Sequence, residues 1–194
     1  MLSKLCFLDG ENKEKALYFA PDTFENLIKK RSIVVDGSSL NFRPIHCSDA
    51  KLVIKNGKAV RSNEELSSPS LSEKALKAIA GLIHSMPYLT AFLVQHPEDY
   101  ARFAPGYEAP TKIAWGYFNR SAVIRIPYYE KPGEARIEVR APVPLGNQYA
   151  KFVALHQAMM TGFENDYPTP KPVACNLYKN SNLYKLHATG LGVG

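Results

Sequence analysis

Four charged side chains in the second half of the chain have the types and spacing of an anion-binding surface. Arg136, Glu138 and Arg140 alternate with apolar residues, so a strand over 135–141 places all three on one face. Arg125, in the preceding apolar run, extends that face. Guanidinium groups bind carboxylates and phosphates bidentately and stay charged when partly buried. The pattern indicates a floor for an anionic substrate, and an outward face of cross-strand ion pairs fits it equally well.

Residues suited to other chemistry are scattered. The loop over 102–110, with two prolines and a glycine, fits either a mobile flap or an ordinary connection. His46 and Asp49 offer too few ligands for a metal site. The three cysteines have no metal spacing and no partner base, so we expect reduced thiols in a cytoplasmic protein. Glycine-rich loops of the Walker or dinucleotide-binding type do not occur.

Length and composition limit the class of protein. The chain has 194 residues, 45% of them apolar and 22% charged, which fits one compact domain with or without a small appendage. We see no apolar run of the roughly 18 residues that span a bilayer and no signal peptide, so we expect no membrane partner. The net charge of +6 suits nucleic acid or a small anion. Because the later arginines are spaced singly among apolar residues, the sequence favours a small acidic ligand and no nucleic acid.

The first 60 residues predict a small open-sheet domain with one packed helix. A capping-box pattern at 22–25 opens the helix, and Asn56-Gly57 supplies the turn of a hairpin over 51–60. Further strands are expected over 4–8, 16–19 and 33–35. The polar, serine-rich stretch 61–70 is then expected to be a linker.

The remainder, 71–194, alternates helices and strands. Ser70 and Glu73 form a second capping box before a helix that Pro87 is expected to stop. A second helix is expected over 148–161, between Asn147 as its cap and Gly162 as its stop. Its apolar face is predicted to consist of Tyr149, Phe152, Val153, Met159, Met160 and Phe163. Three strands are expected over 112–117, 121–129 and 135–141.

Several ordered stretches together resemble the glutamine synthetase family. The segment 35–39, followed by 45–49, resembles the end of that family's N-terminal β-grasp domain, and 71–76 resembles the helix before its flap. The C-terminal half of the family is matched in order and spacing by 105–110, 119–127, 135–140 and 147–150, followed by 176–178. The resemblance implies an α+β fold, with a β-grasp-like domain at 1–60 and a partial catalytic domain at 71–194. That domain would be a curved antiparallel sheet with flanking helices.

The resemblance also implies roles for eight charged residues at a site for glutamate and ATP. These roles are Asp36 and Glu108 as catalytic carboxylates at ammonium, Arg102 and Arg140 at the carboxylates of glutamate, Arg120 and Arg125 facing the phosphates, Arg136 at the nucleotide, and Glu138 as a metal ligand. Tyr178 falls near a tyrosine that some bacterial members adenylylate, and Tyr184 is a second candidate.

By the same resemblance, this chain lacks a central stretch that the family has. Glutamine synthetases are more than twice this long, and 61–70 stands where the family has the central stretch that carries most of its metal ligands. Glu138 alone cannot hold two Mg²⁺ or Mn²⁺ ions, so we predict an internally deleted, catalytically inactive homologue. It would keep part of the glutamate- and phosphate-binding face and the subunit-contact elements, and ATP with Mg²⁺ or Mn²⁺ is expected only if the family activity persists.

Two alternatives remain open at this point. One is an active ATP-dependent glutamate–ammonia ligase whose metal site is rebuilt from residues such as Asp49, Glu64 or Glu65, or from a neighbouring subunit. The other is an assembly module that pairs with full-length glutamine synthetase. We expect a homo-oligomer, with the exposed sheet edges covered by dimerisation or by the C-terminal tail.

Overall fold

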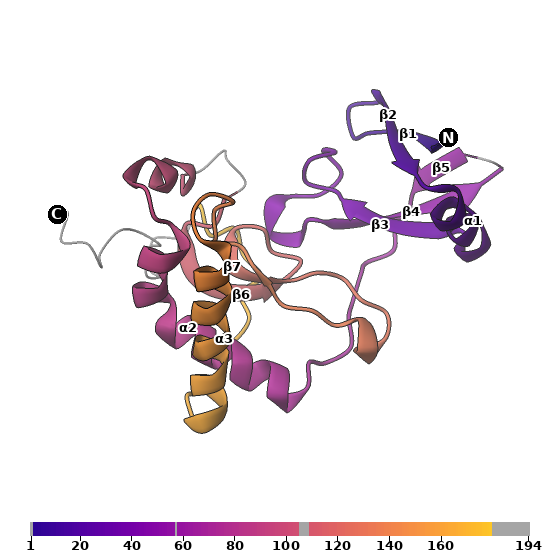
Figure 1. Cartoon of the computed structure of the whole chain (residues 1–194). Helices are drawn as coiled ribbons and strands as arrows, with labels where there is room; N and C mark the ends of the chain where they lie inside the picture. The colour runs from indigo at the N-terminus through magenta and orange to yellow at the C-terminus, as the bar shows by residue number, and fades with distance from the viewer. Residues whose placement is uncertain (1, 57, 105–108, 180–194) are drawn as a thin grey trace. The chain divides into compact units, whose positions relative to one another are not determined.

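The computed structural model describes residues 2–56, 58–104 and 109–179, which fall into two compact units, Met1–Ser67 and Ser68–Gly194. Each unit combines helices with small sheets, as Figure 1 shows, and this confirms the α+β class.

The first unit begins with a two-stranded hairpin of β1 (Ser3–Leu8) and β2 (Glu14–Phe19). The Asp9 carboxylate accepts hydrogen bonds from the backbone N–H groups of Glu11 and Lys13, both at 2.9 Å. Asn12 adopts the left-handed conformation with φ of 61°. These features make 9–13 the tight polar turn that joins the strands.

A three-stranded antiparallel sheet completes this unit, in the order β3 (Ser32–Asp36), β4 (Asp49–Lys55) and β5 (Lys58–Arg61). The β4–β5 hairpin confirms the turn predicted at Asn56, whose φ is 50°. Helix α1 (Pro21–Lys30) buries Leu27, and a short 3₁₀ turn, η1 (Ile45–Cys47), precedes β4. The buried core of the unit comprises Leu5, Phe7, Leu27, Phe42, Ala50, Leu52 and Ala59.

The predicted capping box of α1 is wrong. The helix starts at Pro21, and its N-cap residue is Ala20, which has no side chain able to accept a hydrogen bond. Proline suits the first helical position because its fixed φ matches the helix and its missing N–H would be unpaired there anyway. The helix therefore begins before the expected cap.

The sheet of the second unit has the order β6 (Lys112–Tyr117), β7 (Ala122–Ile126) and β8 (Glu138–Val139). Strand β7 pairs antiparallel with β8, but β6 and β7 are parallel. The expectation of a purely antiparallel sheet is therefore wrong at this pair. The connection over 118–121 is held by its own side chains, because Asn119 accepts hydrogen bonds from the Ser121 N–H and hydroxyl at 3.0 and 2.6 Å.

The last strand is much shorter than predicted. Only Glu138 and Val139 form ladder pairs, and one further bond joins the Arg140 N–H to the Val123 carbonyl at 2.8 Å. The 3₁₀ turn η3 (Pro132–Glu134) leads into this strand, and Pro142 follows it. Proline cannot donate to a ladder, so pairing is confined to the residues between them.

Helices α2 (Glu73–Leu93) and α3 (Gln148–Glu164) pack against each other and, with the sheet, enclose the main core. The predicted stop at Pro87 is wrong, because α2 continues for six residues past it. Burial of Met86, Leu89 and Leu93 in the core outweighs the lost backbone bond. The cap of α2 is Ser72, whose hydroxyl accepts from the Ala75 N–H.

By length and composition α2 could also cross a bilayer, although no apolar stretch of that length was expected from the sequence. Half of that stretch is buried within the fold, as in the core helix of a globular unit. A second 3₁₀ segment, η2 (Pro97–Arg102), follows α2.

Helix α3 has the predicted N-cap, since the Asn147 side chain accepts from the Ala150 N–H at 3.1 Å. Its predicted apolar face is wrong in its first half: Tyr149, Phe152 and Val153 are 85%, 71% and 68% exposed. The helix instead buries the opposite side, which includes Lys151. Gly162 does not stop the helix, because it lies inside α3 at the contact with α2.

The segment after α3 covers the outer edge of the sheet. The Val173 N–H donates to the Trp115 carbonyl at 2.8 Å, and the Trp115 indole donates to the Pro170 carbonyl at 2.7 Å. The Asn119 amide adds bonds to the carbonyls of Val173 and Cys175. At this edge of β6 the structure confirms the expectation that the C-terminal part covers an exposed strand.

Candidate anion-binding site

The charged face predicted from the sequence forms where β7 meets β8. Arg125 lies directly opposite Glu138 in the strand register. Arg125 Nη1 bonds to Glu138 Oε2 at 2.5 Å, and Arg140 Nε bonds to Oε1 of the same carboxylate at 3.1 Å. Each oxygen of Glu138 therefore accepts from a different guanidinium group.

Burial makes this cluster electrostatically unusual. The side chains of Arg125 and Arg140 are 9% and 11% exposed, while that of Glu138 is 38% exposed. Burial lowers the pKa of Arg140, Glu138 opposes that shift, and the nearby charges of Arg120 and Arg125 lower the pKa further. Guanidinium groups held this close together repel one another, and the Glu138 carboxylate offsets part of that repulsion.

Arg102 lies beside the end of β8. Its Nη1 donates to the Ala141 carbonyl at 3.1 Å, and its guanidinium carbon lies 5.1 Å from the centre of the Phe103 ring. Burial lowers its pKa, and the charge of Asp99 partly opposes the shift. The structure therefore brings Arg102 close to the backbone of the arginine cluster, with one nitrogen engaged by a carbonyl.

One other predicted residue of the second unit, Arg136, is not part of this cluster. Arg136 is exposed and precedes β8, so it does not share the ladder face as the longer predicted strand required. Asp36 belongs to the first unit, at the end of β3. Glu108 and Tyr184 lie outside the described residues.

Asp36 is held by its own loop. Its Oδ1 accepts from the Ser38 N–H at 3.1 Å and from the Ser38 hydroxyl at 2.7 Å, and its Oδ2 accepts from the Ser39 hydroxyl. A side chain at Gly37 would lie 2.7 Å from the Ala50 Cβ, so the tight loop requires glycine there. The carboxylate is thus fixed in position by local hydrogen bonds.

Two polar residues, Asn119 and Tyr178, shape the site in ways that the sequence pattern does not predict. Asn119 is fully buried beside Arg120 and ties its loop to the C-terminal segment. The Tyr178 hydroxyl donates to the Ala109 carbonyl at 2.9 Å and also influences the pKa of Arg140. A hydrogen-bonded Asn or Tyr has no periodic signature, so only the folded chain reveals such roles.

Among the described residues, the surroundings of Glu138 offer too few oxygen ligands to hold a divalent cation. Mg²⁺ and Mn²⁺ are bound by several oxygen ligands. Both Glu138 oxygens accept from guanidinium groups. Across the described residues, no group of three or more His, Cys, Asp or Glu side chains is arranged to hold a metal.

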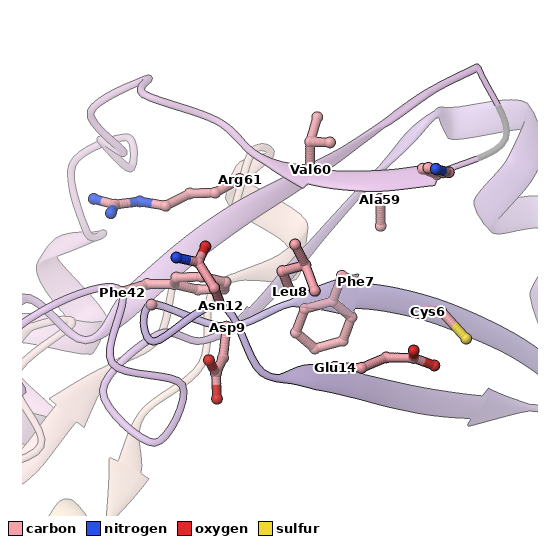
Figure 2. A pocket seen from close by; sticks show the side chains of 12 residues that line it. Cys6, Phe7, Leu8, Asp9, Asn12, Glu14, Phe42, Ala59, Val60 and Arg61 are labelled. Atoms are coloured by element: carbon pink, nitrogen blue, oxygen red, sulfur yellow. The ribbon is translucent and has the colours of Figure 1, made fainter.

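A separate pocket of about 580 Å³ lies in the first unit between β1 and β5. Figure 2 shows Phe7 and Leu8 facing Ala59 across it, with Phe42 and Arg61 at one end. The Arg61 guanidinium carbon lies 5.7 Å from the centre of the Phe42 ring. Because none of the predicted site residues lines this pocket, we place the candidate site at the arginine cluster of the second unit.

The family is shown by comparison with known proteins. The glutamine synthetase catalytic-domain model matches residues 43–191. Among curated relatives, the glutamine synthetase of Methanocaldococcus jannaschii is 35% identical over 165 residues, covering 82% of this chain and 36% of that protein. Those of Aquifex aeolicus and Haemophilus influenzae are 39% and 38% identical, covering 64% and 69% of this chain and 26% and 28% of theirs.

The chain therefore belongs to the glutamine synthetase family. It spans between about a quarter and about a third of the length of these relatives.

Proposed function

We propose that this chain binds a small acidic ligand, such as glutamate or a phosphate group, at the arginine cluster and does not perform the family's ligase reaction. The observation that carries the proposal is the convergence of Arg125 and Arg140 on Glu138, with Arg120 close enough to act on Arg140. Buried guanidinium groups are the residue type that recognises carboxylates and phosphates.

The proposal that the ligase reaction is lost is supported by the chemistry that this reaction needs. In the relatives' reaction class, phosphoryl transfer to glutamate depends on divalent metals that neutralise developing charge. The described residues offer no arrangement for such metals. We propose a binding protein, related to the synthetases but with its catalytic step lost, and a cytoplasmic location like that expected from the cysteines.

Ligand-induced stabilisation tests the binding function. A ligand at a hundred times its Kd stabilises the folded state by about 2.7 kcal/mol, so glutamate or ATP is expected to raise the melting temperature. Arg140→Ala removes the effect, and Lys171→Ala, which changes an exposed cation outside the cluster, keeps it. Equal responses of both variants would contradict the proposed site.

A second candidate function, self-assembly, is favoured by the surface of α3. Tyr149, Phe152 and Val153 are largely exposed, and residues 152–163 contain no Asp, Glu, Lys or Arg; His156 is their one titratable side chain. In a chain of net charge +6 with His neutral, a contact between two copies through this face, which has no Asp, Glu, Lys or Arg over 152–163, buries apolar surface and keeps the permanent like charges apart. We propose a second copy of the chain as the occupant.

The oligomeric state tests this second candidate. Light scattering during size-exclusion chromatography is expected to give a dimer that Val153→Asp converts to a monomer. Lys55→Asp, an exposed change in the first unit, leaves the dimer intact. A monomer at every concentration would contradict self-assembly, and a mixed complex formed only with full-length glutamine synthetase would identify that protein as the occupant instead.

A further inference from the structure

We propose that a pocket of the second unit binds an apolar monocarboxylate, whose carboxylate pairs with the buried ammonium group of Lys151. The pocket has a volume of about 570 Å³ and lies between α3 and the segment that contains β8. None of the arginines of the candidate site lines it, so the inference goes beyond the proposed function.

Apolar side chains make up most of the pocket wall. They come from α2, from the segment that contains β8 and from α3, and include Leu82, Ile137, Val139, Phe152, Leu155 and Met159. Because side chains alternate along a strand, Val139 lies on the face of β8 opposite to Glu138. A mostly apolar wall with few polar groups is typical of small-molecule sites. The pocket is therefore separate from the arginine cluster and suits a hydrocarbon group.

The charge of Lys151 indicates an anionic ligand. The residue is 2% exposed, and its ammonium group donates to the backbone carbonyls of Val143 and Leu145. An ammonium group has three N–H donors, so one remains after these two bonds. Within the described part of the chain no carboxylate pairs with Lys151, and none of the residues that line the pocket is acidic. A buried charge without a counter-ion is costly.

The position of Lys151 along the chain adds to this cost and locates the charge in the pocket. It lies in the first turn of α3, where the helix dipole favours negative and disfavours positive charge. Both of its carbonyl acceptors belong to the connection between Pro142 and Gln148, and these two residues line the pocket. The ammonium group therefore lies at that end of the pocket, where a carboxylate would supply the counter-ion.

The other polar side chains of the lining fit a ligand with a single charge. The Gln148 amide donates to the carbonyls of Pro144, Leu145 and Gly146, and His156 is exposed. Lys151 is thus the one permanent charge among the described residues that line the pocket. One negative charge on an apolar body balances it, and octanoate is a simple probe of that class.

Calorimetry with octanoate, hexanoate and 1-octanol gives the first test. We expect octanoate to bind at least about tenfold more tightly than 1-octanol, because only the acid forms a charge-assisted bond with Lys151. We expect hexanoate to bind about 15-fold more weakly than octanoate, since each buried CH₂ group changes the Kd about fourfold. Equal affinities for octanoate and 1-octanol, or no binding of octanoate, would overturn the inference.

Three variants, each checked for folding by circular dichroism, give the second test. Lys151→Met is expected to lose the preference for octanoate over 1-octanol, a ratio that a general loss of stability would not change. Leu155→Trp fills the pocket and abolishes octanoate binding. Tyr149→Trp makes a similar change at an exposed residue of α3 outside the pocket, and binding is kept. An unchanged preference in Lys151→Met, or equal binding by the two tryptophan variants, would overturn the inference.

Competition separates this pocket from the arginine cluster and from a contact between two copies. A large excess of glutamate or phosphate, which have no hydrocarbon chain, is expected to leave octanoate bound. Displacement by either would place octanoate at the arginine cluster and overturn the inference, whereas failure of glutamate and phosphate to bind at all would overturn only the proposed function. Val153→Asp should bind octanoate as the original chain does. Binding by that variant alone would identify a second copy as the occupant and overturn the inference.

Discussion

Gly81 of α2 and Gly162 of α3 lie back to back where the two helices cross. A Cβ atom at Gly81 would lie 2.7 Å from the Gly162 nitrogen and 2.2 Å from the Ala158 carbonyl oxygen. A Cβ atom at Gly162 would meet the Lys77 carbonyl oxygen at 2.1 Å. Because each glycine meets the backbone of the other helix, side-chain movement cannot relieve the crowding.

This contact predicts that Gly162→Ala lowers the free energy of unfolding by about 1–3 kcal/mol, the usual range for overpacking a tight contact. Denaturant unfolding followed by circular dichroism measures the change. Gly133→Ala is the matched control, because a Cβ atom there meets nothing within 4 Å. Equal stabilities of the two variants would show that the helices do not cross at these glycines.

The side chain of Asn119 holds the C-terminal segment to the sheet. Its amide nitrogen donates to the carbonyls of Val173 and Cys175 at 3.0 and 3.1 Å. Asn119→Asp cannot donate and places a negative charge against two carbonyl oxygens, so we expect a loss of about 2–4 kcal/mol and faster proteolysis near 170–178. Asn147→Asp is the control: an aspartate caps α3 as well as asparagine does, and stability should hardly change.

Replacing the buried Lys151 by an apolar residue is expected to lower the free energy of unfolding. The residue is 2% exposed, and its ammonium group donates to the carbonyls of Val143 and Leu145. Lys151→Met keeps most of the volume but leaves both carbonyls without this donor. We expect a loss of about 1–3 kcal/mol in the free energy of unfolding. A variant as stable as the original chain would mean that water or other groups satisfy these carbonyls.

The Asp9 carboxylate is expected to make a pH-dependent contribution to the stability of the first unit. The Lys13 N–H is the main cause that lowers the pKa of Asp9, with the Glu11 N–H and the Lys15 charge assisting against the opposing effect of burial. A carboxyl whose pKa is lower in the folded state stabilises that state above its unfolded pKa of about 3.9, and the contribution disappears as pH falls below that value.

The stability difference between the original chain and Asp9→Asn should therefore be constant near neutral pH and shrink below about pH 4. Urea titrations at several pH values measure it. The exposed control Asp166→Asn should show little difference at any pH. A difference for Asp9→Asn that persists unchanged at acid pH would contradict the assigned hydrogen bonds.

The sequence predicted the local features that have a short-range signature. The Asn56 hairpin, the Asn147 cap and the shared face of Arg125 and Glu138 follow from turn chemistry, capping and strand alternation, and the structure contains all three. They were predictable because each depends on residues close in sequence or on a period of two.

The features that could not be predicted depend on tertiary contacts. Pro87 stays inside α2 because its neighbours are buried, and Gly162 stays inside α3 because Gly81 lies against it. The exposed side of α3 looks apolar in the sequence, and nothing local distinguishes it from the buried side. At the site, the alternation of side chains along the predicted strand indicated that Glu138 lies beside arginines. Only the folded chain shows that both of its carboxylate oxygens accept hydrogen bonds from guanidinium groups.

Phosphate release by the pure protein with glutamate, ATP, ammonium and either Mg²⁺ or Mn²⁺ tests the central claim most directly. Our account predicts no ammonium-dependent release at any metal concentration, together with retained anion binding that Arg140→Ala abolishes. Ammonium-dependent release that is lost in Glu108→Ala would contradict the account, because it would mean that the chain still performs the ligase reaction.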